Sequence, residues 1–351
     1  MGKTKHLLVI RLSAMGDVAM TVPVLKSLLD SYPNLKITIL TKEFLKPIFE
    51  GLERVTVHVA EVSDTHKGIV GLWKLYKELQ TLQLDAVADL HNVLRSNVLK
   101  QFFRLGGTPF AQIDKGRKEK KALTAEKNKV FAPLKSTHQR YVEVFNQLGY
   151  PFSLPDASFL DKKTLSDKIL GIVGKDTRKW LGISAFAAFS GKMYPLHLMR
   201  QVVQKLNNTH KYKIFLFGGG AKEKEYLELW ENEFQECINM VGKCSFDEEL
   251  ALISNLDLML SMDSGNAHLA AMYRVPVITL WGVTHPYTGF YPYGQDLDNA
   301  LLSNRSIFPL IPTSIYGNKV PKGYEKVMET IDPTTIFNKV DQLLNKQQDS
   351  N

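Results

Sequence analysis

The stretch HLLVIRLSAMGDVAMTVPVL at residues 6–25 lies near the start of the chain. Residues 6–11 form a short, largely apolar run that Arg11 closes, and small residues follow at 13–16. After Asp17, apolar side chains recur at helical spacing. This pattern predicts a strand, a tight turn and a helix, the building unit of an α/β sheet.

The same alternation of strand and helix continues through the first half of the chain. We expect strands at 36–41, 55–59 and 86–90 and a helix at 72–82. Parallel strands need long crossover connections, which helices supply. The order therefore predicts a parallel sheet wrapped by helices.

A second α/β unit begins near residue 180. Strands are expected at 180–186, 212–217, 238–241, 256–262 and 275–280, and helices at 195–207, 221–234, 245–254 and 333–344. Pro151 and Pro155 interrupt the periodicity, so the linker region falls within 150–178. We expect an N-terminal domain at 1–165, a C-terminal domain at 166–330, and a final helix and tail at 331–351.

Composition supports this organisation. A chain of 351 residues is too long for one ordinary core, and its 44% hydrophobic and 23% charged residues argue against disorder, fibre or coiled coil. No apolar run approaches the roughly 18 residues that span a bilayer, and none resembles a signal peptide. Two cysteines, Cys237 and Cys244, provide neither a disulfide framework nor a paired metal knuckle. We therefore expect a cytoplasmic protein.

The net charge is +8, from 44 Lys and Arg against 36 Asp and Glu. This excess favours an anionic partner such as a phosphate, an acidic sugar, an anionic membrane or a nucleic acid, although a solvated surface explains it equally well. The densest basic run contains Arg117, Lys118, Lys120 and Lys121. It is either a solvated loop or an electrostatic landing site for an anionic acceptor.

Ligands of open parallel sheets bind at the carboxyl ends of the strands. We therefore expect the ligand-binding residues in loops that follow strands. Asp263, Ser264 and Gly265 follow the apolar strand at 256–262 and precede a helical segment. Free N–H groups at such a helix start, with a glycine that permits close approach, can hold phosphate oxygens. Asp263 and Ser264 could instead cap the helix. His268 by itself is more often a structural hydrogen-bonding group.

Other loop residues have a functional and a structural interpretation. Gly218–Gly220 lies between a strand and a helix but lacks the Gly-x-Gly-x-x-Gly spacing of dinucleotide sites. Glu223 could accept hydrogen bonds from ribose hydroxyls or simply stabilise the helix start. Lys192 could neutralise a diphosphate or be a solvated loop lysine. Asp17 could cap a helix, or aim a carboxylate into a cleft that two facing domains would share.

The sequence gives little support for a metal site. Asp296 and Asp298 have the Asp-x-Asp spacing of some metal-dependent sugar transferases. They follow a loop rich in Gly and aromatic residues instead of a strand, so we discount them and expect no metal ligands.

Taken together, these loops resemble the ADP-heptose:lipopolysaccharide heptosyltransferase family over almost the whole chain. The residues that carry the resemblance are Ile10–Val18 with Thr21–Pro23, Asp85–His91 with Arg95 and Ser96, Lys192 with Pro195, Gly219 and Gly220 with Glu223, and Asp263–Gly265 with His268, Ala270 and Ala271. Tyr194 stands where the family commonly has Trp, and the loop at 184–190 is rich in Ala and Phe instead of polar residues.

The resemblance implies a GT-B fold, in which two Rossmann-like domains face each other and a C-terminal helix returns to their junction. It implies an acceptor-binding N-terminal domain, a donor-binding C-terminal domain, and inverting transfer that requires no metal or other cofactor. The co-substrate would be ADP-heptose and the acceptor an anionic lipopolysaccharide core. The resemblance also allows a peripheral contact with the inner membrane and implies no nucleic acid.

Roles for individual residues follow from this implied chemistry. Asp17 would remove the proton of the attacking hydroxyl, and Lys192 would stabilise the leaving diphosphate with the amides of Ser264 and Gly265. The remaining assignments are Asp263 on the turn or a sugar hydroxyl, Glu223 on the ribose, His268 bracing the turn, and Arg117, Lys118, Lys120 and Lys121 on the acceptor. The alternatives are a transferase or epimerase for another nucleotide-sugar and a non-catalytic glycan- or nucleic-acid-binding protein.

Overall fold

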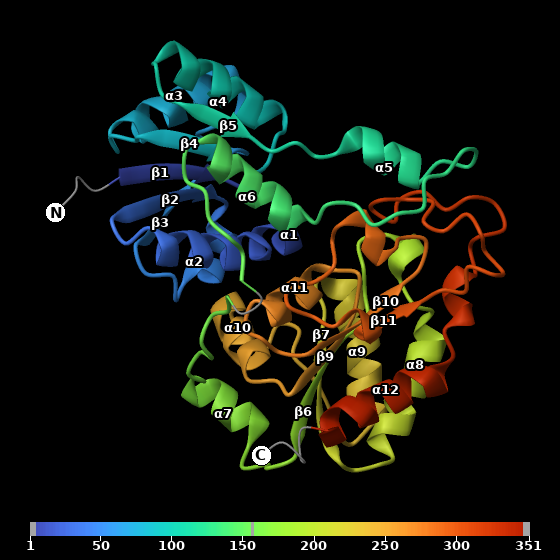
Figure 1. Ribbon diagram of the computed structural model, residues 1–351. Helices are drawn as coiled ribbons and strands as arrows, with labels where there is room; N and C mark the ends of the chain where they lie inside the picture. Colours follow the sequence, from blue (N-terminus) through green and yellow to red (C-terminus); the bar gives the residue numbers. More distant parts are fainter. Residues whose placement is uncertain (1–4, 156–157, 347–351) are drawn as a thin grey trace. The chain divides into compact units, whose positions relative to one another are not determined.

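The computed structural model describes residues 5–155 and 158–346. Its internal contacts divide the chain into two units (Figure 1). The first contains the chain up to Arg117 together with Lys135–Leu160, and the second contains Lys118–Leu134 and the chain from Asp161 on. The change of unit at Leu160 lies close to the expected boundary at 165. The segment Lys118–Leu134, which sequence order places in the first domain, belongs to the second unit.

The first unit is built around a five-stranded parallel sheet with the order β3-β2-β1-β4-β5. Its strands are β1 (Lys5–Ile10), β2 (Leu35–Thr41), β3 (Val55–Val59), β4 (Ala86–Asp89) and β5 (Phe110–Gln112). Its helical segments are α1 (Met15–Ala19), α2 (Thr21–Ser31), η1 (Glu43–Phe49), α3 (Gly68–Gln80), α4 (Leu94–Leu105) and α6 (Thr137–Gln147). The helix α5 (Arg117–Leu123) starts at Arg117, the last residue of the first unit before the chain enters the second unit, so its other residues belong to the second unit.

The residues of β1 explain how this sheet is covered. Successive side chains of a strand point to opposite faces. Leu8 and Ile10 accordingly join one buried cluster with residues of α3 and α4, such as Leu75 and Leu99. Figure 1 shows α3 and α4 over one face and α2 over the other. A continuous apolar strand is therefore required, because both of its faces are buried.

The second unit has a six-stranded parallel sheet with the order β11-β10-β9-β6-β7-β8. Its strands are β6 (Lys179–Ser184), β7 (Tyr212–Phe217), β8 (Cys237–Asn239), β9 (Leu258–Met262), β10 (Val277–Trp281) and β11 (Ala300–Leu302). Its helical segments are α7 (Asp167–Val173), η2 (Ser190–Lys192), α8 (Leu196–Asn207), α9 (Ala221–Glu233), α10 (Phe246–Ser254), α11 (Gly265–Ala271), η3 (Pro286–Thr288), η4 (Leu297–Asn299), η5 (Val327–Thr330) and α12 (Pro333–Lys346).

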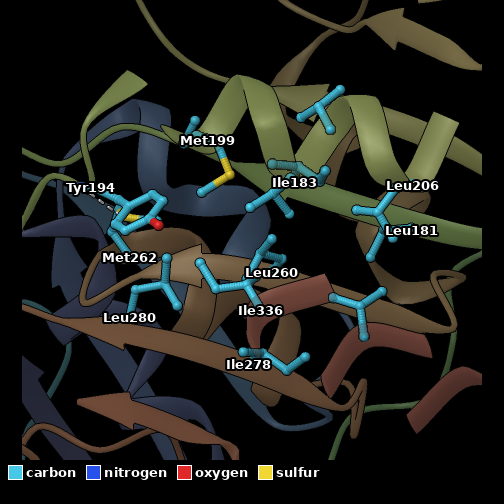
Figure 2. Packing of buried hydrophobic residues seen from close by; sticks show 14 of the residues in the cluster. Leu181, Ile183, Tyr194, Met199, Leu206, Leu260, Met262, Ile278, Leu280 and Ile336 are labelled. Atoms are coloured by element: carbon cyan, nitrogen blue, oxygen red, sulfur yellow. Dashed lines mark hydrogen bonds between the residues drawn. The ribbon is translucent and has the colours of Figure 1, made fainter. Parts of the chain in front are cut away.

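The core of this unit also includes the chain's last helix. Ile336 and Val340 of α12 are buried with Met199 of α8 and with Ile278 and Leu260 of the sheet (Figure 2). The expected C-terminal helix therefore exists and packs on the second unit. Residues 347–351 of the expected tail lie outside the described residues.

Tyr194, which stands where the resembling family commonly has Trp, is a core residue. Its side chain is fully buried, its hydroxyl donates to the Ile331 carbonyl at 2.6 Å, and Figure 2 shows it beside Met262. The hydrogen bond satisfies the one polar atom that a tyrosine adds to an apolar core. Tyr194 therefore fills a packing position.

Several elements depart from the sequence expectation. The linker region at 150–178 contains a helix, α7, which the prolines obscure. The basic run at 117–121 lies on a helix, α5, and is not a loop. The lysines and the arginine of α5 are good helix formers, which explains the helix. Only Lys120 and Leu123 of α5 are buried, so its sequence lacks the apolar period that would predict a helix.

Candidate functional site

The carboxyl edge of the first sheet carries a cluster of charged residues. The strands β2 and β3 lie on one side of β1 in the sheet, and β4 and β5 lie on its other side. The direction in which strands are added therefore reverses between β1 and β4. Ile10 pairs with Asp89 in register, which places the two strand ends together. Ligands of open α/β sheets bind at such a switch point. The loops after β1 and β4 are therefore the candidate site of this unit.

Arg11 and Asp17 form an ion pair in the loop after β1. Nη2 of Arg11 lies 2.7 Å from Oδ2 of Asp17, and the two side chains are 8% and 25% exposed. Nη1 of Arg11 donates to the Leu90 carbonyl at 2.6 Å, so the guanidinium links this loop to the end of β4. The planar fork of arginine makes both contacts at once. The carboxylate is thereby fixed at the sheet edge.

Asp17 lies in the first turn of α1 and does not occupy the capping position before the helix. Its Oδ2 also accepts from the Ala14 N–H at 3.3 Å. Both contacts use Oδ2, so within the described residues Oδ1 keeps its lone pairs available. Tyr141 of α6 donates to the Asp17 carbonyl at 3.3 Å and is fully buried. The carboxylate of Asp17 therefore has two features. Its Oδ2 supports the turn before α1, as the capping interpretation expects, and its Oδ1 is available to a ligand.

His91, after β4, lies beside the same loop. Its Nδ1 accepts from the Leu12 N–H at 3.4 Å, and its Nε2 lies 3.5 Å from Ser13 Oγ. Burial, followed by the nearby charges of Arg11 and Lys115, lowers the pKa of His91 to about 3. The imidazole is therefore neutral at pH 7, and the hydrogen bond to Nδ1 assigns the proton to Nε2.

The carboxyl edge of the second sheet carries the predicted phosphate-binding residues. Here the order reverses between β6 and β9, and Ser184 pairs with Ser261 in register. Asp263 directly follows β9, and its Oδ2 lies 3.5 Å from Nζ of Lys192, which ends η2 after β6. The two side chains are only 8% and 15% exposed. The structure thus brings Lys192 and Asp263 together at the switch point.

Glycines hold the loop of Lys192 close to its neighbours. The Gly191 carbonyl accepts from the Val283 N–H at 2.8 Å, after β10. A Cβ on Gly191 would lie 2.5 Å from the Gly317 carbonyl oxygen, and a Cβ on Gly317 would lie 2.1 Å from Cγ of Lys192. Only backbones without side chains fit this contact. The lysine is consequently held in one place by its packing.

The turn between β9 and α11 is positioned by side-chain hydrogen bonds. Ser264 occupies the N-cap position of α11, yet its hydroxyl lies 3.0 Å from Ser261 Oγ and makes no capping bond. Asn266 donates to Ser184 Oγ at 2.9 Å, which joins α11 to the end of β6. Gly265 begins the helix, and His268 is buried on it. The amides of Ser264 and Gly265 therefore remain candidates for an anionic ligand.

Glu223 supports the glycine loop after β7. Its Oε2 accepts from the Gly219 N–H at 2.7 Å, from the first turn of α9. One carboxylate oxygen therefore fixes the backbone of the loop. This geometry satisfies the structural interpretation of Glu223, and its binding of a ribose stays a prediction.

The predicted acceptor-binding run contains side chains of two kinds. Arg117, Lys118 and Lys121 are exposed on α5. Lys120 is buried, and its Nζ lies 4.4 Å from the centre of the Phe290 ring in the same unit. We therefore separate Lys120 from the other three, because an ammonium packed on an aromatic face contributes to packing.

Asp296 has a local structural role. Its side chain accepts from the Asp298 N–H at 3.0 Å and caps η4. Among the residues that the structure describes, no three His, Cys, Asp or Glu side chains are grouped so as to hold a metal ion.

Sequence reasoning missed the partners of the predicted residues. Arg11 reads as the end of an apolar strand, and His91 as one residue of a later loop. Burial, followed by the nearby charges of Arg11 and Arg117, lowers the pKa of Lys115, which lies after β5. A signal existed for two of them, because Arg11 directly follows β1 and His91 directly follows the strand expected at 86–90. Only the strand order shows that these strands are neighbours.

Comparison with known proteins gives the family. The sequence model of glycosyltransferase family 9 (heptosyltransferase) matches residues 72–308. The chain therefore belongs to this family and is a glycosyltransferase. The lipopolysaccharide core heptosyltransferase OpsX of Haemophilus influenzae is 27% identical over 310 residues, covering 85% of this chain and 84% of that protein.

Solved structures agree on the fold. The crystal structure of the family 9 glycosyl transferase from Veillonella parvula has a TM-score of 0.74 at 20% identity and covers 99% of both chains. The E. coli ADP-heptose lps heptosyltransferase II has a TM-score of 0.69 at 19% identity and covers 98% of this chain and 99% of that one. The predicted GT-B fold class of two Rossmann-like parallel sheets is thereby confirmed.

A helix that crosses a bilayer needs about 20 mostly apolar residues. Within residues 5–155 and 158–346, no helix combines the length and the apolar character needed to cross a membrane.

Proposed function

We propose that this enzyme transfers a heptose from ADP-heptose to an inner-core acceptor of lipopolysaccharide, with inversion at the anomeric carbon and without a metal ion, in the cytoplasm. The names of its relatives support the sugar, the nucleotide and the acceptor. The first unit would bind the acceptor and the second the donor.

The observation that carries the proposal is the position of Asp17. Its carboxylate is fixed by Arg11 at a sheet switch point, with Oδ1 available to a ligand. His91 is a poor alternative base, because its Nδ1 already accepts from the Leu12 N–H and its Nε2 then carries the ring proton, so neither nitrogen has a free lone pair. Asp17 is therefore the group that would accept the proton.

The reaction can be written with these groups. The oxygen of an acceptor hydroxyl attacks the anomeric carbon, the bond from that carbon to the diphosphate oxygen breaks, and the hydroxyl proton passes to Asp17. Negative charge accumulates on the departing diphosphate. Lys192 and the amides of Ser264 and Gly265 would stabilise this charge more in the transition state than in the ground state.

The remaining donor residues would position the nucleotide-sugar. Asp263 would hold Lys192 in place or accept from a sugar hydroxyl, Glu223 would accept from the ribose, and His268 would brace the turn. The exposed cations Arg117, Lys118 and Lys121 would attract the anionic acceptor.

Asp17→Ala tests the proposal. Transfer, measured as ADP release, should fall at least about a hundredfold, as expected for loss of a general base. Calorimetric binding of the donor should stay nearly unchanged. Asp30→Ala, which removes an exposed carboxylate of α2, is the matched control and should transfer normally. Unchanged turnover in Asp17→Ala would remove Asp17 from the mechanism.

Two further measurements test the donor and the metal. A thermal-shift panel of ADP-, UDP- and GDP-sugars should show stabilisation by ADP-heptose, since a ligand that binds only the native state raises apparent stability. Stabilisation by a UDP-sugar alone would favour the other transferases and epimerases. Transfer should persist in saturating chelator, whereas activity restored by metal would bring Asp296 and Asp298 back into consideration.

A further inference from the structure

Helices α3 and α4 share a surface that the proposed chemistry does not use. Five large apolar side chains on it are exposed: Ile69 (69%), Val70 (84%), Trp73 (45%), Leu94 (81%) and Leu105 (86%). We call these residues the α3–α4 surface. Single exposed apolar residues are ordinary, but a group on two adjacent helices marks an interaction site.

Helical spacing shows that the residues of each helix share a face. Residues three or four apart lie on the same side of a helix. Ile69 and Trp73 are related in this way on α3. Leu94 and Leu105 share a stripe on α4 with the partly buried Val98, which lies between them.

An aromatic contact makes the two faces continuous. The rings of Trp73 and Phe102 lie 5.0 Å apart, edge to face, at the contact of α3 with α4. The exposed part of Trp73 therefore lies next to the stripe on α4, and the apolar residues form one surface over both helices.

On the two helices that carry this surface, the charges are almost all positive. Their exposed basic residues are Lys74, Lys77, Arg95 and Arg104, Lys100 is instead bonded to Gln112 at 3.0 Å, and the one acidic residue is Glu78. Glu78 is engaged with His58 and His66, at 3.4 and 3.2 Å. Nζ of Lys77 lies 5.0 Å from the centre of the Trp73 ring. Cations therefore border the apolar residues directly.

We propose that the α3–α4 surface docks on the anionic surface of a phospholipid bilayer. Aliphatic side chains can enter the acyl boundary, a tryptophan is favoured at the headgroup level, and lysines and arginines are attracted to anionic headgroups. A protein partner would need matching carboxylates and shape, whereas a bilayer satisfies both charge and apolar surface without either. The docking deepens the proposed function, because a lipid-anchored acceptor lies at such a surface.

Vesicle co-sedimentation of the whole protein tests the docking. The vesicles are phosphatidylglycerol with phosphatidylcholine, or phosphatidylcholine alone, and they contain neither acceptor nor donor. The wild-type protein should bind the anionic vesicles, more weakly as salt rises, and bind the neutral vesicles poorly. The result does not depend on heptose transfer, so failure of docking and failure of the proposed function are separate outcomes.

Exposed substitutions identify the surface. Ile69→Gln with Val70→Gln should lower binding at least about tenfold by removing buried apolar area. Lys74→Gln with Lys77→Gln should lower binding to anionic vesicles roughly 30-fold. Trp73→Phe should remove a blue shift of tryptophan emission on vesicle addition. All variants should keep wild-type transfer to a soluble acceptor.

Helix α9 of the second unit supplies matched controls. Leu229 is exposed to a similar degree, at 63%, and Lys222 and Lys224 are exposed on the same helix. Leu229→Gln and the double variant Lys222→Gln with Lys224→Gln should bind vesicles like the wild type. Absence of wild-type binding to anionic vesicles, or wild-type binding by the α3–α4 variants, would overturn the proposal. So would a change from dimer to monomer in those variants with unaltered vesicle binding, which would assign the surface to a second copy of the chain.

Discussion

The guanidinium of Arg11 contacts the carboxylate of Asp17 at 2.7 Å and the carbonyl of Leu90 through its other terminal nitrogen. One buried side chain thus joins the loop after β1 to the end of β4. Asp17 owes its position to a residue six places earlier and to a strand end far along the chain. We therefore assign Arg11 a positioning role.

Arg11→Lys should separate this role from the charge itself. The lysine side chain is shorter and carries one ammonium group, so it cannot make both the contact with Asp17 and the contact with the Leu90 carbonyl. We expect kcat to fall at least about tenfold, through loss of the fixed geometry, with donor Kd unchanged. Steady-state kinetics and calorimetry measure the two quantities. A folded Arg11→Lys enzyme with wild-type kcat would contradict the assignment.

Gly317→Ala should displace Lys192 without removing its charge. The new Cβ would lie 2.1 Å from Cγ of Lys192, so the lysine must move. We expect ADP to bind about tenfold more weakly, because a charge-assisted contact to the diphosphate is lost or weakened.

Gly323→Ala is the control for this variant. Both glycines have a positive φ, +80° at Gly317 and +87° at Gly323, but a Cβ at Gly323 meets nothing within 4 Å. Both substitutions therefore share the backbone strain of about 1–2 kcal/mol, and only one adds the collision. Equal ADP affinity in the two variants would show that Lys192 does not need its observed position.

Acid should weaken the second unit through Asp176. Hydrogen bonds from Arg178 lower the pKa of Asp176 to about 2, from 3.8. Because the folded-state pKa is depressed, this stabilisation is present above pH 4 and is lost as the pH falls from about 4 to about 2. Asp176→Asn should lower the free energy of unfolding by about 1 kcal/mol at pH 7, after allowance for solvent screening.

Tryptophan fluorescence during denaturant unfolding at several pH values, in a Trp73→Phe background, measures this effect, since the remaining Trp180, Trp230 and Trp281 all belong to the second unit. Asp30→Asn, at an exposed pair with Lys26, is the control and should change stability little. An acid-induced loss of stability of the same size in Asp176→Asn and the wild type would refute the prediction.

The exposed cations of α5 and its buried Lys120 should have different functions. Neutralising the exposed Arg117, Lys118 and Lys121 should raise the acceptor KM several-fold at low salt and little at high salt, because screening already weakens exposed charges there. Lys120→Gln should mainly lower the melting temperature, through loss of its contact with Phe290. An acceptor KM that is insensitive to the three exposed cations would make this face of α5 an ordinary solvated surface.

The sequence alone determined the fold class and most elements, because period and apolar runs report local geometry directly. The strand at 55–59 and the strand at 212–217 coincide with β3 and β7. The helix α5 and the three-residue strands β5 and β11 were not predicted, since their burial depends on distant partners, whereas the equally short β8 was expected at 238–241. Lys120 illustrates the point: its sequence neighbours are all polar, yet Phe290 covers it.

The candidate site divides in the same way. Asp17, Lys192, Glu223 and Asp263 could be proposed from motifs that follow strands, because the carboxyl ends of parallel strands carry ligand sites in any such sheet. Only the tertiary structure decided that Arg11 binds Asp17, that Lys192 meets Asp263, and that Gly317 packs against that lysine. These pairings depend on strand order and on contacts between residues far apart in the chain, which local propensity does not encode.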